Sequence, residues 1–222
     1  MLKLLSRCAG IDQLVPQDNF AGSSDEHAPL MSLPSIFKTT VATIPAQVPY
    51  VFPDPALLDK WRSTWPDGPG FKIGIAWRGS PAHPEDRFRS IPLHAFAPLA
   101  AVPGIRWFSM QKGPGQEQLT SAPFEVVDLS DRLHDFADTA AALMNLDLVI
   151  TADTALVHLA GALGRPAWVA LQFAPDFRWF LERDDSPWYP TVRLFRQSGR
   201  GQWNEVFEHM ADELAKVVPA LA

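Results

Sequence analysis

The most constraining feature of the sequence is a regular alternation that begins at residue 71, where short apolar runs typical of buried β-strands are separated by runs typical of helices. Strands are expected over residues 71–77, 105–110, 124–129, 147–152, 166–172 and 191–197, and helices over 92–102, 115–121, 135–146, 154–164 and 203–218. Strands that alternate with helices imply right-handed βαβ units and a parallel sheet. The predicted fold class is therefore α/β, a doubly wound Rossmann-like sheet, in which ligands bind at the carboxyl ends of the strands, near the switch point between the first and fourth strands.

The chain before residue 71 has a different character. Residues 1–50 hold short apolar pieces between polar loops, with a helix expected near 2–8, and they lack the pattern of a complete domain. Residues 51–70 have the composition of a proline-rich linker with one helix inside it. Asp54 is expected to cap that helix and Pro55 to be its first residue.

Composition and charge narrow the class of protein. The 222 residues suit one large domain, or one domain and part of a second, and 47% hydrophobic with 20% charged residues fit a globular protein with a core. The net charge of −6 disfavours non-specific nucleic-acid binding, so an anionic ligand would need a local cluster of basic side chains. Cys8 is the only cysteine, which excludes an intramolecular disulfide and a cysteine-based metal site and makes a cytoplasmic location the default. No run approaches the ~18 apolar residues of a membrane span.

The junction after the fourth expected strand is the first candidate site. If that strand ends near Thr151, Asp153 lies at or near the N-cap of the following helix, and the residues from Thr154 to Leu156 present free N–H groups at the positive end of the helix dipole. Such an end binds anions, and the small Ala155 would let a diphosphate approach the backbone. A plain aspartate cap on a core helix explains the same residues about equally well.

His158 lies one helical turn after Thr154 and on the same face. It could donate to a phosphate or orient the loop before the helix. Taken alone, packing between Val157 and Leu159 explains this histidine better.

The loop after the first expected strand carries Arg78, Arg87 and Arg89 at the same predicted edge. Arginines there could neutralise a phosphate through paired hydrogen bonds, although pairing with Glu85 or Asp86 is the simpler explanation. The glycine spacing of this loop does not match G-x-G-x-x-G, so a nicotinamide dinucleotide is disfavoured.

Further polar residues follow the second and third expected strands. Gln111 and Lys112 leave the second strand at this edge, where either could meet a base, a ribose or a phosphate, and Asp135 is expected to cap the next helix. The aromatic segment 173–190, which includes Trp179, either walls a cleft or forms a satellite hydrophobic cluster. No metal-ligand spacing and no nucleophile elbow is present in the sequence.

Taken in order, AWRGSP, DRFRSIPL, FSMQKGPG and the segments 128–171 and 173–197 resemble the C-terminal lobe of GT-B glycosyltransferases. The likeness is closest to heptosyltransferase-like bacterial proteins, often joined to tetratricopeptide repeats, and more distant to O-GlcNAc transferases. It covers residues 68–217, with a weaker likeness over 1–66. The D-T-A-x-x-H-L-A-G-A-L-G-x-P run, from Asp153 to Pro166, is its most diagnostic part.

The resemblance implies three parts: a remnant of the N-terminal lobe over 1–50, an interlobe linker over 51–70, and a nucleotide-sugar-binding lobe over 71–222. It implies that the sugar and diphosphate lie near Asp153, Thr154 and Ala155, that Arg89 binds phosphate, that Gln111 belongs to the donor-side loop, and that His158 buttresses the phosphate loop. Together with Arg78 these are the predicted substrate-binding residues. Helix N–H groups and arginine would neutralise the leaving diphosphate without a metal, so neither metal nor cofactor is expected.

The sequence departs from this family in its first part. About 60 residues stand where a full lobe needs well over 100, and the family's glycine-rich acceptor loop and catalytic base have no match, so the catalytic residues stay unknown. The expected partner is a nucleotide sugar, with a protein acceptor or a second subunit as a further candidate. Three functions remain open: a glycosyltransferase-type protein incomplete on its own, a non-catalytic interaction module on this scaffold, and a sugar-nucleotide epimerase.

Overall fold

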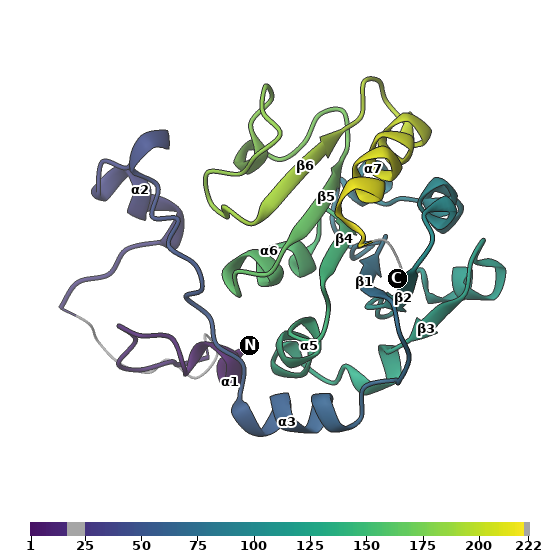
Figure 1. Cartoon of the computed structure of the whole chain (residues 1–222). Helices are drawn as coiled ribbons and strands as arrows, with labels where there is room; N and C mark the ends of the chain where they lie inside the picture. Colours follow the sequence, from purple (N-terminus) through teal and green to yellow (C-terminus); the bar gives the residue numbers. More distant parts are fainter. Residues whose placement is uncertain (17–24, 220–222) are drawn as a thin grey trace.

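A computed structural model describes residues 1–16 and 25–219 of the chain (Figure 1). Its centre is one all-parallel sheet in the order β3-β2-β1-β4-β5-β6, which confirms the predicted doubly wound Rossmann-like fold. The strands are β1 Phe71–Ala76, β2 Ile105–Ser109, β3 Val126–Asp128, β4 Leu148–Ala152, β5 Ala167–Leu171 and β6 Val192–Arg196. The switch point falls between β1 and β4, where Ile73 lies opposite Leu148.

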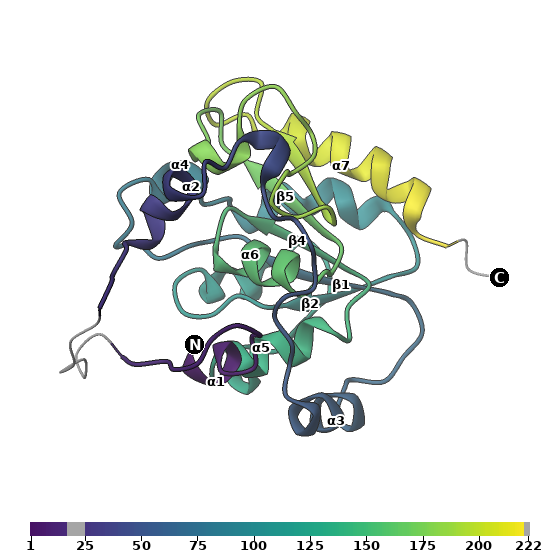
Figure 2. The same ribbon diagram turned by 90° about the vertical axis from the view of Figure 1, so that its left-hand side faces the viewer.

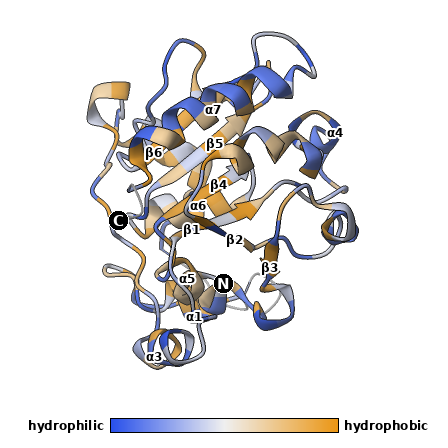
Figure 3. Ribbon diagram, turned by 45° about the vertical axis from the view of Figure 1, so that its right-hand side comes forward, coloured by the Kyte–Doolittle hydropathy of each residue, from blue (hydrophilic) through white to orange (hydrophobic). Residues whose placement is uncertain are grey.

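Helical segments cover both faces of the sheet. They are α3 Pro55–Ser63, α4 Asp86–Arg89, η4 Leu93–Ala101, η5 Gln116–Ser121, α5 Phe136–Leu143, α6 Ala155–Ala162, η7 Phe177–Trp179 and α7 Trp203–Val217. One face packs against α5 and α6, with α3 beyond α5 (Figure 2), and the other packs against η4 and α7, where the rings of Phe96 and Phe207 lie 4.3 Å apart. The central strands are apolar, whereas α7 is polar on its outer side (Figure 3).

Two of the expected α-helices are instead 3₁₀ segments. The segment η4 contains Pro98, whose ring and missing N–H oppose an α-helical turn. The segment η5 is short and starts after Gly115, which has a φ of 102°. The third strand is also shorter than expected.

The first 70 residues run along the outside of this core. The segment α1 Leu2–Leu5 packs against α5 and is shorter than the helix expected near 2–8. The helix α3 begins as predicted, because the Asp54 carboxylate accepts from the Ala56 N–H at 2.8 Å. Between them η2 Leu30–Ser32, α2 Leu33–Ile36 and η3 Val41–Thr43 form an arm, and the Tyr50 N–H then donates to the Ala162 carbonyl. Within residues 1–16 and 25–219, no helix combines the length and apolarity that crossing a membrane requires.

Candidate functional site

A cleft of about 720 Å³ opens at the carboxyl ends of β1, β2 and β4, beside the switch point. This volume is within the usual range for small-molecule sites. Five of the seven predicted substrate-binding residues line it, namely Arg78, Arg89, Gln111, Thr154 and Ala155. We refer to it as the sheet-edge cleft. Asp153 and His158 lie outside its lining.

The N-terminus of α6 forms one wall of this cleft. Its cap is Thr154, whose Oγ1 accepts from the Leu156 N–H at 3.4 Å, and Asp153, expected at or near the cap, lies one residue before it. The strand β4 ends at Ala152, the expected end of this strand, and Asp153 lies between it and the Thr154 cap. Because Thr154, Ala155 and Leu156 all line the cleft, the positive end of the helix dipole borders it.

Two arginines on the first loop share one buried carboxylate. Asp86 Oδ1 lies 3.4 Å from Arg89 Nε, and Asp86 Oδ2 lies 3.9 Å from Arg78 Nε. The pairing expected as the simpler explanation is therefore present, and it holds both guanidinium groups at the cleft rather than removing them from it. A side chain at Gly79 would collide with Arg89 and Asp86, so glycine makes the arrangement possible.

Arg89 also connects the two loops at the switch point. Its Nη1 donates to the Asp153 carbonyl at 2.9 Å, a contact between residues far apart in the sequence. The Asp153 carbonyl is thus held by the first loop, next to the α6 cap. Arg89 is 16% exposed in its side chain, which leaves part of the guanidinium open to the cleft.

The Gln111 side chain links the loops that line the cleft through hydrogen bonds. Its Oε1 accepts from the N–H groups of Trp77 and Arg78, both at 3.0 Å, and its Nε2 donates to the carbonyls of Arg78 and Pro114. These four bonds use the hydrogen-bonding capacity of the amide, and the residue is buried. Gln111 therefore shapes the loop that carries Arg78, and a direct contact of its amide with a ligand would need one of these bonds to break.

The opposite wall comes from the start of α5 and the loop before it. Asp135 caps α5 as predicted, since its Oδ1 accepts from the N–H groups of Ala137 and Asp138 at 2.8 and 3.0 Å. The bond from Asp138 is the main reason that the pKa of Asp135 is below its usual value. Lys112 lines the same side, and its Nζ donates to the carbonyls of Leu133 and Ser130.

His158 and the Asp153 side chain lie behind the α6 wall. His158 Nε2 is 3.8 Å from Asp153 Oδ1, and Nδ1 is 3.2 Å from the Tyr189 hydroxyl. The imidazole also stacks on Trp179, with ring centres 5.3 Å apart. Burial lowers the pKa of His158, while the nearby Asp153 carboxylate opposes this effect.

Trp179 is fully buried in the main core, so this tryptophan neither walls the sheet-edge cleft nor belongs to a separate satellite cluster. The contact of Tyr189 with His158 was not anticipated from the sequence. A signal for it exists at Gly161, where a side chain would collide with the Tyr189 ring.

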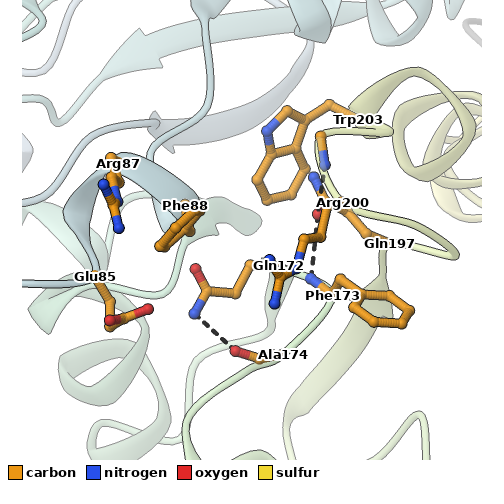
Figure 4. A pocket seen from close by; sticks show the side chains of 10 residues that line it. Glu85, Arg87, Phe88, Gln172, Phe173, Ala174, Gln197, Arg200 and Trp203 are labelled. Carbon is orange, nitrogen blue, oxygen red and sulfur yellow. Dashed lines mark hydrogen bonds between the residues drawn. The ribbon is translucent and has the colours of Figure 1, made fainter.

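A second, smaller pocket of about 130 Å³ lies beyond the ends of β5 and β6 (Figure 4). The helix α4 separates it from the sheet-edge cleft, because Arg89 faces the cleft whereas Arg87 and Phe88 line the small pocket. Gln172 and Gln197 form its floor, and each is already hydrogen-bonded to the backbone at Ala174 or Phe173. This pocket is too small for a nucleotide.

No group of three or more His, Cys, Asp or Glu residues that could hold a metal ion occurs within the described part of the chain. The polar groups that border the sheet-edge cleft include the N-terminus of α6 and two guanidinium groups, which suit an anion.

Comparison with known proteins finds a sequence relative that covers most of the chain. Protein FlbA of Caulobacter vibrioides is 30% identical to the chain over 192 residues, which covers 82% of the chain but 31% of FlbA. The chain thus spans about a third of the length of this relative. No family model matches the chain.

Two solved structures share the fold. ADP-heptose LPS heptosyltransferase II of E. coli aligns with a TM-score of 0.55 over 80% of the chain and 57% of that protein. E. coli heptosyltransferase WaaC, solved with ADP-2-deoxy-2-fluoro heptose, aligns with a TM-score of 0.53 over 86% of the chain and 57% of that protein. Both are 16% identical in sequence. At this identity the likeness concerns architecture, and the chain has a glycosyltransferase-like α/β fold.

Proposed function

We propose that the sheet-edge cleft binds the nucleotide-diphosphate part of a sugar donor, and that the chain is the donor-binding part of a glycosyltransferase-type protein. The observation that carries this proposal is the convergence of the α6 N-terminus with Arg78 and Arg89 on one cleft of suitable size. The solved heptosyltransferase with the same fold binds an ADP-sugar analogue, which supports the choice of ligand class.

The residues suggest how the diphosphate would be held. Backbone N–H groups at Thr154 and Ala155 would face phosphate oxygens, and the two guanidinium groups would supply the opposite charge. In a displacement at the anomeric carbon, the same groups would stabilise the charge that develops on the leaving diphosphate. This arrangement needs no metal.

We propose further that transfer requires residues outside this chain. Asp135 is the one carboxylate among the cleft-lining residues that the structure describes, and it is engaged in capping α5. The chain matches 57% of each heptosyltransferase, so a second lobe would be the source of an acceptor site and a catalytic base.

Calorimetric titration with UDP-, GDP- and ADP-sugars tests donor binding. We expect one of these ligands to bind, and Arg89→Ala to weaken its binding about 10- to 100-fold, as loss of a charge-assisted hydrogen bond would. Asp153→Ala is expected to weaken binding less. The matched control is Arg87→Ala, which removes an arginine from the other side of α4. Folded protein that binds none of the three ligands would contradict the proposal.

A second candidate is a non-catalytic interaction module. The specific observation is the arm between α1 and α3, where Leu30, Met31 and Phe37 are 81%, 75% and 74% exposed. Light scattering distinguishes the two candidates. A strict monomer that binds a nucleotide sugar tightly would count against the interaction module, and self-association without nucleotide binding would favour it.

A further inference from the structure

A contact behind the cleft, between Tyr189 and His158, has no part in the ligand binding proposed above. Tyr189 lies between β5 and β6, and its backbone is fixed on both sides: its N–H donates to Ser186 Oγ, and its carbonyl accepts from the Val192 N–H at 3.0 Å. Its ring occupies space that is free because residue 161 is glycine. The phenol is thus delivered to His158 Nδ1, at 3.2 Å, from a rigid position.

The protonation states of this pair follow from their surroundings. Burial and the neighbouring Tyr50 raise the pKa of Tyr189, so the phenol keeps its proton. Burial keeps the imidazole of His158 neutral near pH 7, which leaves one N–H on the ring. The carboxylate of Asp153 lies 3.8 Å from Nε2 and favours the proton there, so Nδ1 accepts from the Tyr189 hydroxyl.

Two further charged side chains near the imidazole have opposite effects on its pKa. Asp176 and Arg178, from the segment around η7, act on it with opposite signs, and Trp179 from the same segment covers one face of the ring. The Nε2 edge is therefore directed at Asp153 by packing on one side and by the Tyr189 hydrogen bond on the other.

Asp153 is consequently held from two directions. Its carbonyl accepts from Arg89, and its carboxylate faces His158 rather than the cleft. This residue immediately precedes the Thr154 cap, so its position sets where the first N–H groups of α6 point. A carboxylate that turned into the cleft would also repel a bound diphosphate.

We infer that Tyr189 is a positioning residue: through His158 it fixes Asp153 and thereby the anion-binding end of α6. This inference rests on the proposed function for its effect on ligand affinity, but its structural part is independent of any ligand. Tyr189 itself lies outside the lining of the sheet-edge cleft.

The test is Tyr189→Phe, which removes the hydroxyl and retains the ring. Nitrogen-15 NMR should show a shifted His158 Nδ1 resonance, and the backbone amides of Ala155 and Leu156 should shift and exchange faster with solvent. The dissociation constant of the nucleotide sugar should rise about 5-fold, the factor expected from one neutral hydrogen bond. In an Asp153→Asn background, where no carboxylate needs holding, Tyr189→Phe should change affinity little.

Tyr50→Phe is a second variant: it removes the phenol hydroxyl next to Tyr189 and keeps the Tyr189 hydroxyl, so the His158 signal should change less than in Tyr189→Phe. An unchanged His158 signal in Tyr189→Phe, or unchanged amides at the start of α6, would overturn the inference. If the wild-type protein binds a nucleotide sugar, equal affinity in Tyr189→Phe would also overturn it. If no nucleotide sugar binds, the proposed function fails while the NMR signals still decide the role of Tyr189.

Discussion

Two helix N-termini border the same cleft and are capped in different ways. The helix α5 begins with Asp135, whose carboxylate accepts from two backbone N–H groups at 2.8 and 3.0 Å. The helix α6 begins with Thr154, whose hydroxyl accepts from one backbone N–H, that of Leu156, at 3.4 Å. The Asp135 carboxylate neutralises the positive end of the α5 dipole, whereas the N-terminus of α6 keeps most of its positive potential.

The difference assigns opposite roles to the two walls. An anion at α5 would meet the negative charge of Asp135, whose lowered pKa keeps it ionised at neutral pH. An anion at α6 meets a neutral cap and the two arginines of the first loop, while the carboxylate of Asp153 faces His158. The α6 wall therefore suits the diphosphate, and the α5 wall suits uncharged parts of a ligand such as hydroxyl groups.

The largest change in ligand affinity should come from giving α6 an acidic cap like that of α5. Thr154→Asp keeps a good cap, so the fold should be retained, but it places a carboxylate beside the diphosphate. We expect the dissociation constant of the nucleotide sugar to rise on the order of 100-fold by calorimetry, because like charges a few ångströms apart near a surface repel by several kcal/mol. Thr154→Ser, which keeps a neutral hydroxyl cap, is the control and should bind within about 2-fold of the wild type. Wild-type affinity in Thr154→Asp would remove the distinction between the walls.

Much of the scaffold behind this comparison was predictable from the sequence. All six strands were expected, and the signal was clearest for β4 and β5, because strands buried on both faces form continuous apolar runs. The Asp54 and Asp135 caps were also expected, since an aspartate before a helical run is a local signal. Residues 92–102 were expected to form an α-helix because their hydrophobic pattern is helical. Pro98 within this segment favours the 3₁₀ form that is observed.

The site was predicted less completely, for physical reasons. The α6 cap was expected at or near Asp153 and lies at Thr154, because aspartate and threonine are both favoured caps and the local sequence does not separate them. The bond from Arg89 to the Asp153 carbonyl and the contact of Tyr189 with His158 join distant segments, and no local pattern encodes them. Gln111 was placed correctly at the cleft, but its four internal bonds become visible only once the loops are folded.

A smaller effect is expected from removing the charged cap. Asp135→Ala should lower the free energy of unfolding by about 1 kcal/mol in urea denaturation, a typical cost for a lost cap. Its ion pair with Lys3 is exposed and should add little. Nucleotide affinity should stay the same or improve, since a negative charge leaves the cleft lining. Asp135→Ser, with a hydroxyl cap, should recover most of the stability, whereas a loss of affinity in Asp135→Ala would place the diphosphate at the wrong wall.

The smallest expected effect is a difference in how the stability contributed by the two caps depends on pH. Hydrogen bonds from the Asp138 and Ala137 N–H groups lower the pKa of Asp135 in the folded protein. A depressed carboxylate pKa contributes stability that is fully present above the unfolded value of about 3.9 and is lost as the pH falls through the folded value. The destabilisation by Asp135→Ala should thus be constant near neutral pH and shrink below about pH 4. The hydroxyl of Thr154 does not titrate, so the cost of Thr154→Ala should stay flat over the same range. Urea denaturation of both variants and the wild type at several pH values provides the measurement, and a cost of Asp135→Ala that grew on acidification would contradict the carboxylate cap.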